Sequence, residues 1–217
     1  MLDRILPPAV VAVEAFRDDP DATLFPAERA VVEHAVAKRR AEFTTARACA
    51  HAALERLGIT PVPVLPGERG APGWPDGVTG SITHCEGFRA AAVARAAEIR
   101  ALGVDAEPNE PLPDGVLGLI AADRERDQLA GLAAVRSDVC WGRLLFSAKE
   151  SVYKVWFPLA RRWLDFLEAE VIIDPPRAAF TARLLVSGPL VNGEPLTVLH
   201  GRWLSADGLI ATAIALR

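Results

Sequence analysis

The sequence predicts an α+β protein made of two similar halves, each with a three-stranded, mainly antiparallel sheet and one long packed helix. Three observations predict this class. Apolar residues recur at helical spacing over two long segments, short strand-like runs bounded by turn residues follow them, and a Pro-rich segment, PNEPLPDG, separates the two sets. We therefore expect an N-terminal half at 1–108 and a C-terminal half at 109–217, related by a pseudo-two-fold axis inferred from element order alone.

The N-terminal half is expected to contain one long helix at 26–57, opened by Pro26 and closed by Gly58. Its apolar stripe consists of Val32, Val36, Phe43, Ala46, Ala50, Leu54 and Leu57. A long loop rich in Pro and Gly follows, and long ordered loops are often functional. Three strands are predicted after this loop, in the segments SITHC, FRAAAVAR and LGVDAE.

The C-terminal half is expected to begin with helices at 116–134 and 139–157. Strands are predicted near 169–173, 179–186 and 197–216, and the tripeptide ADG interrupts the last of them, which signals a β-hairpin. The second helix has an apolar side made of Trp141, Leu145, Ala148, Val152, Val155, Trp156 and Leu159.

The composition excludes several classes of protein. The chain of 217 residues is 51% hydrophobic and 24% charged, which is typical of a soluble globular protein. A net charge of −4 provides no broad basic surface for nucleic acid, so an anionic ligand must be held by a local cluster of cations. Three dispersed cysteines without metal-binding spacing indicate a reducing compartment. Without a signal peptide or an apolar run long enough to span a bilayer, we expect a cytoplasmic protein.

Two acids lie close together in the predicted strand LGVDAE. In an extended segment Asp105 and Glu107 project from the same face, and two carboxylates at this spacing repel unless a cation or a proton lies between them. Hard oxygen ligands suit Mg²⁺, which commonly takes one or two carboxylates together with phosphate oxygens and water. The alternative is an exposed strand end with two solvated acids.

The helix at 139–157 has a second, polar arc. At 100° per residue this arc gathers Phe146, Lys149, Glu150, Tyr153 and Lys154 away from the apolar side. A charged stripe that includes two aromatic rings favours a functional surface. The alternative is an ordinary i, i+4 salt bridge between Glu150 and Lys154, which would contribute about 0.2–0.5 kcal/mol.

A third group of residues supplies positive charge. Arg40 and Arg47 are seven residues apart on one helix face and border its apolar stripe, from which a guanidinium can reach a cleft. Arg69 lies between glycines in GERG, and Thr83 and His84 in GSITHC offer a hydroxyl and a ring nitrogen to an anion. The alternatives are a solvated helix surface, a turn residue and a half-buried histidine.

GVDAEP and, further along the chain, FSAKESVYK resemble the signature pair of the 4′-phosphopantetheinyl transferase superfamily, G-[VI]-D-x-E followed by [FW]-x-x-K-E-[SA]-x-x-K. The segments KRRAEFTTAR, GERGAPGWPDGVTGSITHC and KVWFPLARRWLDF look like the longer, two-halved enzymes of this superfamily, the surfactin-synthetase-activating and enterobactin type, and above all the actinobacterial ones. The resemblance extends over nearly the whole chain.

This resemblance implies an enzyme that transfers the 4′-phosphopantetheine group of coenzyme A to a serine of an apo carrier protein and releases 3′,5′-ADP. It implies Mg²⁺, or Mn²⁺, as the metal ion. The partners would be carrier proteins or carrier domains of fatty-acid, polyketide, nonribosomal peptide or siderophore synthesis. A monomer is expected, because the longer enzymes form the active site between their two halves.

The resemblance also implies a role for each matching residue. Asp105, Glu107 and Glu150 match the metal ligands, and Glu150 also matches the proposed general base. Lys149 and Lys154 match the lysines of the second motif, with Lys154 placed to contact a phosphate of coenzyme A and the departing charge. The residues matching those that bind the nucleotide, and its 3′-phosphate above all, are Arg40, Arg47, Arg69, Thr83 and His84.

Trp163 resembles a residue that lines the pantetheine channel, and Arg161 and Arg162 are candidates for a basic rim that docks an acidic carrier. Two other functions stay open. A non-catalytic coenzyme A or nucleotide-binding protein would bind the ligand without transfer. A metal-dependent phosphoesterase would use the same acids with water as the nucleophile.

Overall fold

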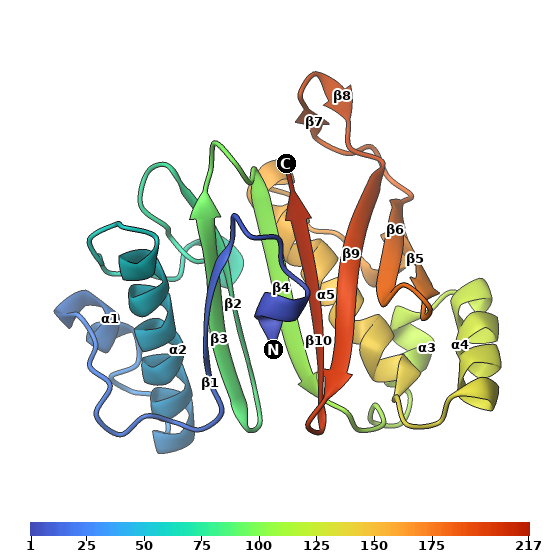
Figure 1. The fold of residues 1–217 in the computed structure, drawn as a ribbon, viewed down its shortest axis with the longest axis horizontal. Coiled ribbons are helices and arrows are strands. Elements are labelled where there is room, and N and C mark those ends of the chain that lie inside the picture. The colour runs from blue at the N-terminus through green and yellow to red at the C-terminus, as the bar shows by residue number, and fades with distance from the viewer.

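Two antiparallel sheets stand side by side in the computed structural model, which describes residues 1–217, and a long helix packs against each sheet (Figure 1). The first sheet has the strand order β1–β3–β2, and the second has the order β4–β10–β9–β6–β5. The predicted α+β class with antiparallel sheets is therefore confirmed. The second sheet has five strands, where the sequence analysis expected three.

The first sheet consists of β1 (Val11–Ala15), β2 (Val78–Cys85) and β3 (Phe88–Arg95), with β3 in the centre and antiparallel to both neighbours. All but the last residue of β3 are buried, because α2 (Ala37–Arg56) covers one face of the strand and the N-terminal segment and β4 cover the other. The sequence analysis did not predict β1.

The helix predicted at 26–57 is interrupted after α1 (Pro26–Val31), and five residues separate Val31 from the start of α2 at Ala37. Within α1 the side chain of Glu28 turns into the interior, where it is fully buried and accepts a hydrogen bond from the N–H of Val64 at 2.8 Å. One continuous helix would have placed Val36 on the apolar stripe. Instead this side chain precedes α2 and is 73% exposed.

The second sheet contains the strand that carries the predicted acids. A third strand of the N-terminal half was expected at LGVDAE, whereas the structure pairs this segment with the C-terminal strand, so that Asp105 lies opposite Thr212. The first six residues of each strand are buried on both faces and most of them are apolar, as expected for strands in the middle of a molecule. The five strands are β4 (Ala101–Pro108), β10 (Leu209–Leu216), β9 (Val198–Ala206), β6 (Ala179–Leu184) and β5 (Ala169–Asp174).

The two sheets meet along β2 and β4, which lie side by side in Figure 1 without a backbone ladder between them. Side-chain hydroxyls take the place of backbone carbonyls at this junction. The Oγ of Ser81 accepts a hydrogen bond from the N–H of Val104 at 3.0 Å, and the Oγ1 of Thr83 accepts one from the N–H of Ala106 at 2.9 Å. Thr83 is therefore directed toward β4.

The predicted helix at 139–157 is confirmed as α5 (Trp141–Ala160), which packs with its apolar side against β4 and β10. The close approach depends on Gly103, because a Cβ at this position would lie 2.2 Å from the carbonyl oxygen of Ser151. The helix predicted at 116–134 is instead divided into α3 (Val116–Ile120) and α4 (Asp123–Val135) by two extended residues, Ala121 and Ala122.

The Pro-rich segment between the predicted halves is fastened to the rest of the molecule. Asn109 donates from Nδ2 to the carbonyl of Asp138 and accepts from the N–H of Cys140, both at 2.8 Å. Arg143 donates to the carbonyls of Glu110 and Pro111. These contacts fasten residues 109–111 to the start of α5 and to the residues just before it.

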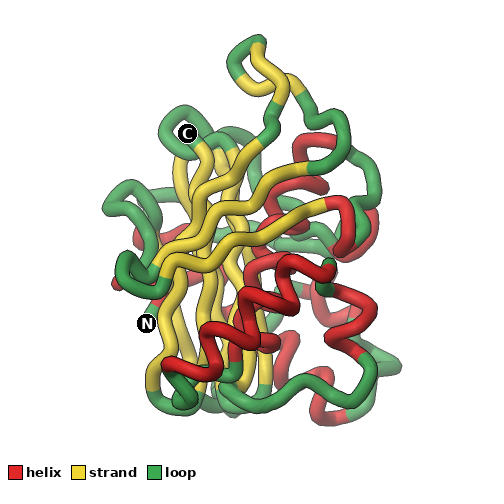
Figure 2. The backbone as a smooth tube through the Cα atoms, turned by 90° about the vertical axis from the view of Figure 1, so that its right-hand side faces the viewer, coloured by secondary structure: helices red, strands yellow, loops and turns green.

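A small hairpin extends beyond the second sheet, as Figure 2 shows at the top of the molecule. It consists of β7 (Leu190–Val191) and β8 (Glu194–Pro195), and the sequence analysis did not predict it. The expected hairpin at ADG is confirmed as the turn between β9 and β10. None of the helices has the length and apolar character needed to cross a bilayer.

Candidate active site

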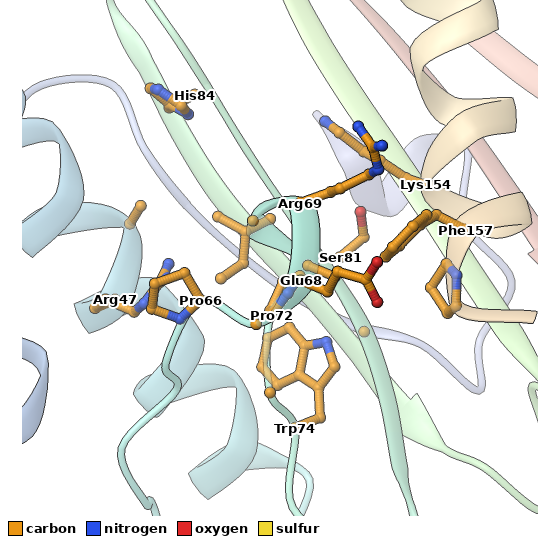
Figure 3. Close-up of a pocket in the computed structure, with 18 of the residues that line it drawn as sticks. Arg47, Pro66, Glu68, Arg69, Pro72, Trp74, Ser81, His84, Lys154 and Phe157 are labelled. Carbon is orange, nitrogen blue, oxygen red and sulfur yellow. The ribbon is translucent and has the colours of Figure 1, made fainter. Parts of the chain in front are cut away.

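A cavity of about 700 Å³ lies between α2, the loop 66–74, β2 and α5 (Figure 3). This volume is within the range of sites for cofactors and small molecules, about 300–1,000 Å³. Figure 3 shows Arg47 on the α2 side of the cavity and Lys154 on the α5 side. The cavity is therefore bounded by elements from both parts of the chain, next to the junction of the two sheets.

Asp105 is buried beside this cavity and is held through one of its two oxygens. Lys154 donates from Nζ to Oδ1 of Asp105 at 2.8 Å and to the carbonyl of Val104 at 2.9 Å. The hydroxyl of Thr83 also donates to Oδ1, at 3.4 Å. The second oxygen, Oδ2, is buried and has no hydrogen-bond partner. A buried carboxylate oxygen without a partner is costly unless a cation or a proton binds there.

The other two acids of the predicted metal site lie within the electrostatic influence of Asp105. Burial and the charge of Asp105 raise the pKa of Glu107 to about 7, although Arg143 binds its Oε2 at 3.0 Å. Burial and Asp105 also raise the pKa of Glu150. The charge of Asp105 thus makes the ionisation of Glu107 and Glu150 less favourable, and a divalent cation would reverse this effect.

These residues fit a divalent cation at Asp105, because they offer hard oxygen donors and one buried oxygen that lacks a partner. The structure does not gather three or more His, Cys, Asp or Glu side chains into a group that could hold a metal. A single ion shared by Asp105, Glu107 and Glu150 therefore stays a prediction. One or two carboxylates are sufficient for Mg²⁺ when substrate oxygens complete its coordination.

Magnesium is expected to raise the free energy of unfolding more at about pH 8 than at about pH 5.5. The pKa of Glu107 lies above its ordinary value in the folded protein, so this residue contributes stability at low pH that is lost as the pH rises from 4.5 toward 7. A metal binds the ionised form, and at about 100 times its Kd it would add about 2.7 kcal/mol.

Thermal unfolding with and without Mg²⁺ at both pH values measures this difference. Glu107→Gln is the control, because a neutral amide at this position should make the stabilisation by Mg²⁺ smaller and less dependent on pH. Equal stabilisation of the wild-type protein at both pH values would contradict the expectation.

Lys149 does not line the cavity between α2 and α5 but lines a smaller neighbouring cavity, so the cofactor-binding role that the sequence motif implies stays a prediction. Its ammonium group donates to the carbonyl of Ile120 at 2.7 Å, to Oε2 of Glu125 at 2.8 Å and to the carbonyl of Phe166 at 2.7 Å. All three N–H groups are therefore used inside the protein, and the side chain is 2% exposed. Lys149 and Lys154 are about 140° apart around the helix, so their side chains leave α5 in different directions.

Arg47 lines the cavity, as the sequence analysis predicted. Its Nε donates to the carbonyl of Val64 at 2.6 Å, and its guanidinium lies 4.2 Å from the centre of the Phe43 ring. Burial lowers the pKa of Arg47 to about 10, so the side chain stays charged at neutral pH. A buried guanidinium whose Nη groups make no hydrogen bond inside the protein is a strong binding partner for phosphate.

Arg69 also lines the cavity, from the loop on its other side. The residue has a left-handed backbone with φ of 52°, and its guanidinium lies 5.3 Å from the centre of the Trp163 ring. Trp163 is 50% exposed and does not line the large cavity. It lines a second cavity of about 210 Å³, together with Glu150 and Tyr153, which line both cavities.

Arg39, and not the predicted Arg40, lines the cavity at the start of α2. Arg40 is exposed, donates to the carbonyl of Ala35 at 3.1 Å and does not line the cavity. The neighbouring Arg39 lines it and donates from Nη1 to Nε2 of His84 at 2.8 Å. Spacing of four residues through Phe43 to Arg47 could have pointed to Arg39.

His84 lines the cavity as predicted, whereas Thr83 faces β4. Partial burial and the guanidinium of Arg39 lower the pKa of His84. Because Nε2 accepts the hydrogen bond from Arg39, the ring is neutral and its remaining N–H is on Nδ1. His84 and Arg39 together can donate to an anion in the cavity.

A cavity lined by cations beside buried carboxylates that suit a divalent ion is typical of enzymes that act on phosphate esters and pyrophosphates. Comparison with protein families identifies the family of enzymes to which the chain is similar. The 4′-phosphopantetheinyl transferase N-terminal domain matches residues 27–94, and the 4′-phosphopantetheinyl transferase superfamily matches residues 101–195. The chain belongs to the 4′-phosphopantetheinyl transferase superfamily.

Three proteins of actinobacteria are similar to this chain over nearly its whole length. The 4′-phosphopantetheinyl transferase Svp of Streptomyces mobaraensis is 59% identical, over 99% of this chain and 89% of its own length. The 4′-phosphopantetheinyl transferase PptT of Mycobacterium tuberculosis is 44% identical, over 94% of this chain and 90% of its own. The 4′-phosphopantetheinyl transferase Npt of Nocardia iowensis is 45% identical, over 99% of both chains. The predicted family, and its likeness to actinobacterial enzymes, are confirmed.

Proposed function

We propose that this chain transfers the 4′-phosphopantetheine group of coenzyme A to the serine hydroxyl of an apo carrier protein and releases 3′,5′-ADP. The observation that supports it best is the position of Lys154. This lysine lines the large cavity and holds Asp105, whose other oxygen is free for a metal. A bound pyrophosphate would therefore lie against a cation on α5 and beside the predicted metal ligands.

The nucleotide end of coenzyme A would be held by the opposite wall of the cavity. Arg39, Arg47 and His84 present three donors there, which suit a 3′-phosphate. Arg69 lies on the loop between this group and Trp163. We propose that the pantetheine arm extends toward the second cavity, where Trp163 forms part of the wall.

Glu150 is proposed as the base that accepts the proton of the attacking serine. It lines both cavities, and its raised pKa makes it a better proton acceptor than an ordinary carboxylate. Lys154 would stabilise the charge that develops on the departing 3′,5′-ADP. When bound at Asp105, Mg²⁺ or Mn²⁺ would neutralise charge on the pyrophosphate.

We further propose a monomer that acts in the cytoplasm on carriers of fatty-acid, polyketide, nonribosomal peptide or siderophore synthesis. A monomer is supported by the cavity, because α2 from the first part of the chain and α5 from the second part form its opposite walls. Arg161 lines the cavity and Arg162 follows it, so both could contact an acidic carrier at the entrance. The boundary at 108/109 and the pseudo-two-fold relation of the halves stay predictions, because β4 pairs with β10 and also lies against β2.

Transfer is tested by incubating the protein with coenzyme A, Mg²⁺ and an apo carrier protein, followed by intact-protein mass spectrometry of the carrier. We expect the carrier to gain the mass of one phosphopantetheine group, and a carrier with Ala in place of its serine to gain none. Release of 3′,5′-ADP without any carrier would favour a phosphoesterase. Binding of coenzyme A without transfer to several unrelated carriers would favour a non-catalytic binding protein.

Arg39 and Arg40 provide a matched pair of variants for the nucleotide site. Arg39→Met is expected to weaken the binding of 3′,5′-ADP by about ten- to a hundredfold, because a charge-assisted hydrogen bond contributes about 1.5–3 kcal/mol. Arg40→Met should change it by less than about twofold, because Arg40 does not line the cavity. Isothermal titration with 3′,5′-ADP measures both, and a larger loss for Arg40→Met would disprove this assignment.

A further inference from the structure

Arg143, near the start of α5, is fixed by three different contacts. Its Nη1 donates to Oε2 of Glu107 at 3.0 Å, its Nε to the carbonyl of Glu110 at 3.1 Å and its Nη2 to the carbonyl of Pro111 at 2.8 Å. The side chain is 16% exposed. The guanidinium therefore ties one predicted metal ligand to the chain segment that follows β4.

Arg143 lies on the same face of α5 as two residues of the candidate site. Arg143, Glu150 and Lys154 occupy positions i, i+7 and i+11, which are within about 40° of one another around the helix. The two cations of this row each hold one acid of β4. Lys154 binds Oδ1 of Asp105, and Arg143 binds Oε2 of Glu107.

The two ion pairs leave corresponding atoms free. Oδ2 of Asp105 has no partner, and Oε1 of Glu107 accepts no hydrogen bond. In each carboxylate one oxygen is thus fixed by a cation from α5, and the other is available to a ligand. A carboxylate held in this way needs no reorientation when a metal binds, and such supporting contacts commonly determine metal affinity.

We propose that Arg143 is a positioning residue for the metal site, which orients the carboxylate of Glu107 and fastens it to the segment 109–111. The inference rests on the proposed function, because it takes Glu107 as a metal ligand. Only an arginine can make this set of contacts, since its planar fork directs three separate N–H groups at a carboxylate and two carbonyls. Arg143 acts through Glu107 and does not itself contact the substrate.

A competing role for Arg143 predicts the opposite change in metal affinity. If Arg143 only neutralised Glu107 in the absence of metal, it would compete with the ion, and its removal would strengthen metal binding. The direction of the change in metal affinity therefore separates positioning from competition.

The test measures the binding of Mn²⁺ alone, by electron paramagnetic resonance of the free ion, to purified full-length variants. Arg143→Met is expected to raise the Kd for Mn²⁺ by about 10- to 100-fold. Arg143→Lys should also weaken binding, though less, and it decides the question if circular dichroism shows that Arg143→Met is unfolded. The matched control is Arg136→Met, because Arg136 makes a two-pronged contact with Asp138 at the surface, at 2.9 and 3.0 Å.

A double variant tests whether Arg143 acts through Glu107. Once Glu107→Gln has removed the charged ligand, adding Arg143→Met should weaken Mn²⁺ binding by less than about twofold. Unchanged or tighter binding by Arg143→Met, with transfer by the wild-type protein intact, would overturn the role of Arg143 and leave the proposed function standing. A wild-type protein that binds no Mn²⁺ and transfers no phosphopantetheine would overturn both.

Discussion

Glu150→Gln is expected to lower kcat for phosphopantetheine transfer by about 10²–10⁴-fold while the affinity for 3′,5′-ADP stays within a few-fold of wild type. The amide has nearly the same shape as the carboxylate but cannot accept the proton of the carrier serine. The nucleotide contacts lie on the α2 side of the cavity, so they should be unaffected. Single-turnover transfer to an apo carrier measures the first quantity, and isothermal titration measures the second.

Glu150 has two proposed roles, and the same variant separates them. If its main contribution were to hold the metal, a high concentration of Mg²⁺ would restore a large part of the lost rate. If it is the base, the rate stays low at saturating Mg²⁺. Glu194→Gln is the control, because Glu194 is exposed on the β7–β8 hairpin. A Glu150→Gln enzyme with near wild-type turnover would show that another group accepts the proton.

The elements that were predicted correctly have strong periodicity of their own. The apolar side of α5 and the β9–β10 hairpin follow from residue spacing and from turn residues, and both are confirmed. The break before α4 was missed because it depends on a buried acid, Glu125, whose side chain caps the start of α4. Glu28 and Glu125 each turn back into the interior, where they accept backbone N–H groups from distant segments. Local spacing contains no information about such long-range contacts.

The candidate site was predicted to the level of segments and less well to the level of side chains. Asp105, Lys154 and Arg47 come together around the cavity because they belong to segments whose character is clear from the sequence. The choice between Arg39 and Arg40 depends on a rotation of about 100°, which is lost when a helix is assigned the wrong start. Arg143 was missed because its partners are a carboxylate and two carbonyls of another segment.

The pairing of β4 has a consequence for how the site is assembled. This strand carries Asp105 and Glu107, pairs with β10 and lies against α5, so the acids and Lys154 belong to one packed unit. The first sheet reaches this unit through Ser81 and Thr83, whose hydroxyls bind the backbone of β4. The Thr83 hydroxyl also contacts Asp105. A change in the relative position of the sheets would therefore alter the hydrogen bonding of the Asp105 carboxylate.

Lys149→Met is expected to lower the free energy of unfolding by about 3–5 kcal/mol, because it leaves Glu125 as an unpaired charge in the interior. Lys149 and Glu125 are each only 2% exposed, so water cannot replace the lost contact. Glu125 also accepts the N–H groups of Ala122 and Val171, so this pair fastens α4 and β5 to α5 next to Glu150. Urea unfolding followed by circular dichroism measures the change.

Two further variants distinguish this structural role from a direct contact with coenzyme A. Lys149→Met combined with Glu125→Gln should recover part of the lost stability, because the amide is neutral and still accepts backbone N–H groups. Lys38→Met should cost less than about 1 kcal/mol, because Lys38 and Glu86 form a surface pair 3.7 Å apart. A Lys149→Met protein with wild-type stability and a much higher KM for coenzyme A would show that the motif lysine binds the cofactor after all. A Lys149→Met protein with wild-type stability and an unchanged KM would exclude both the structural role of Lys149 and its contact with coenzyme A.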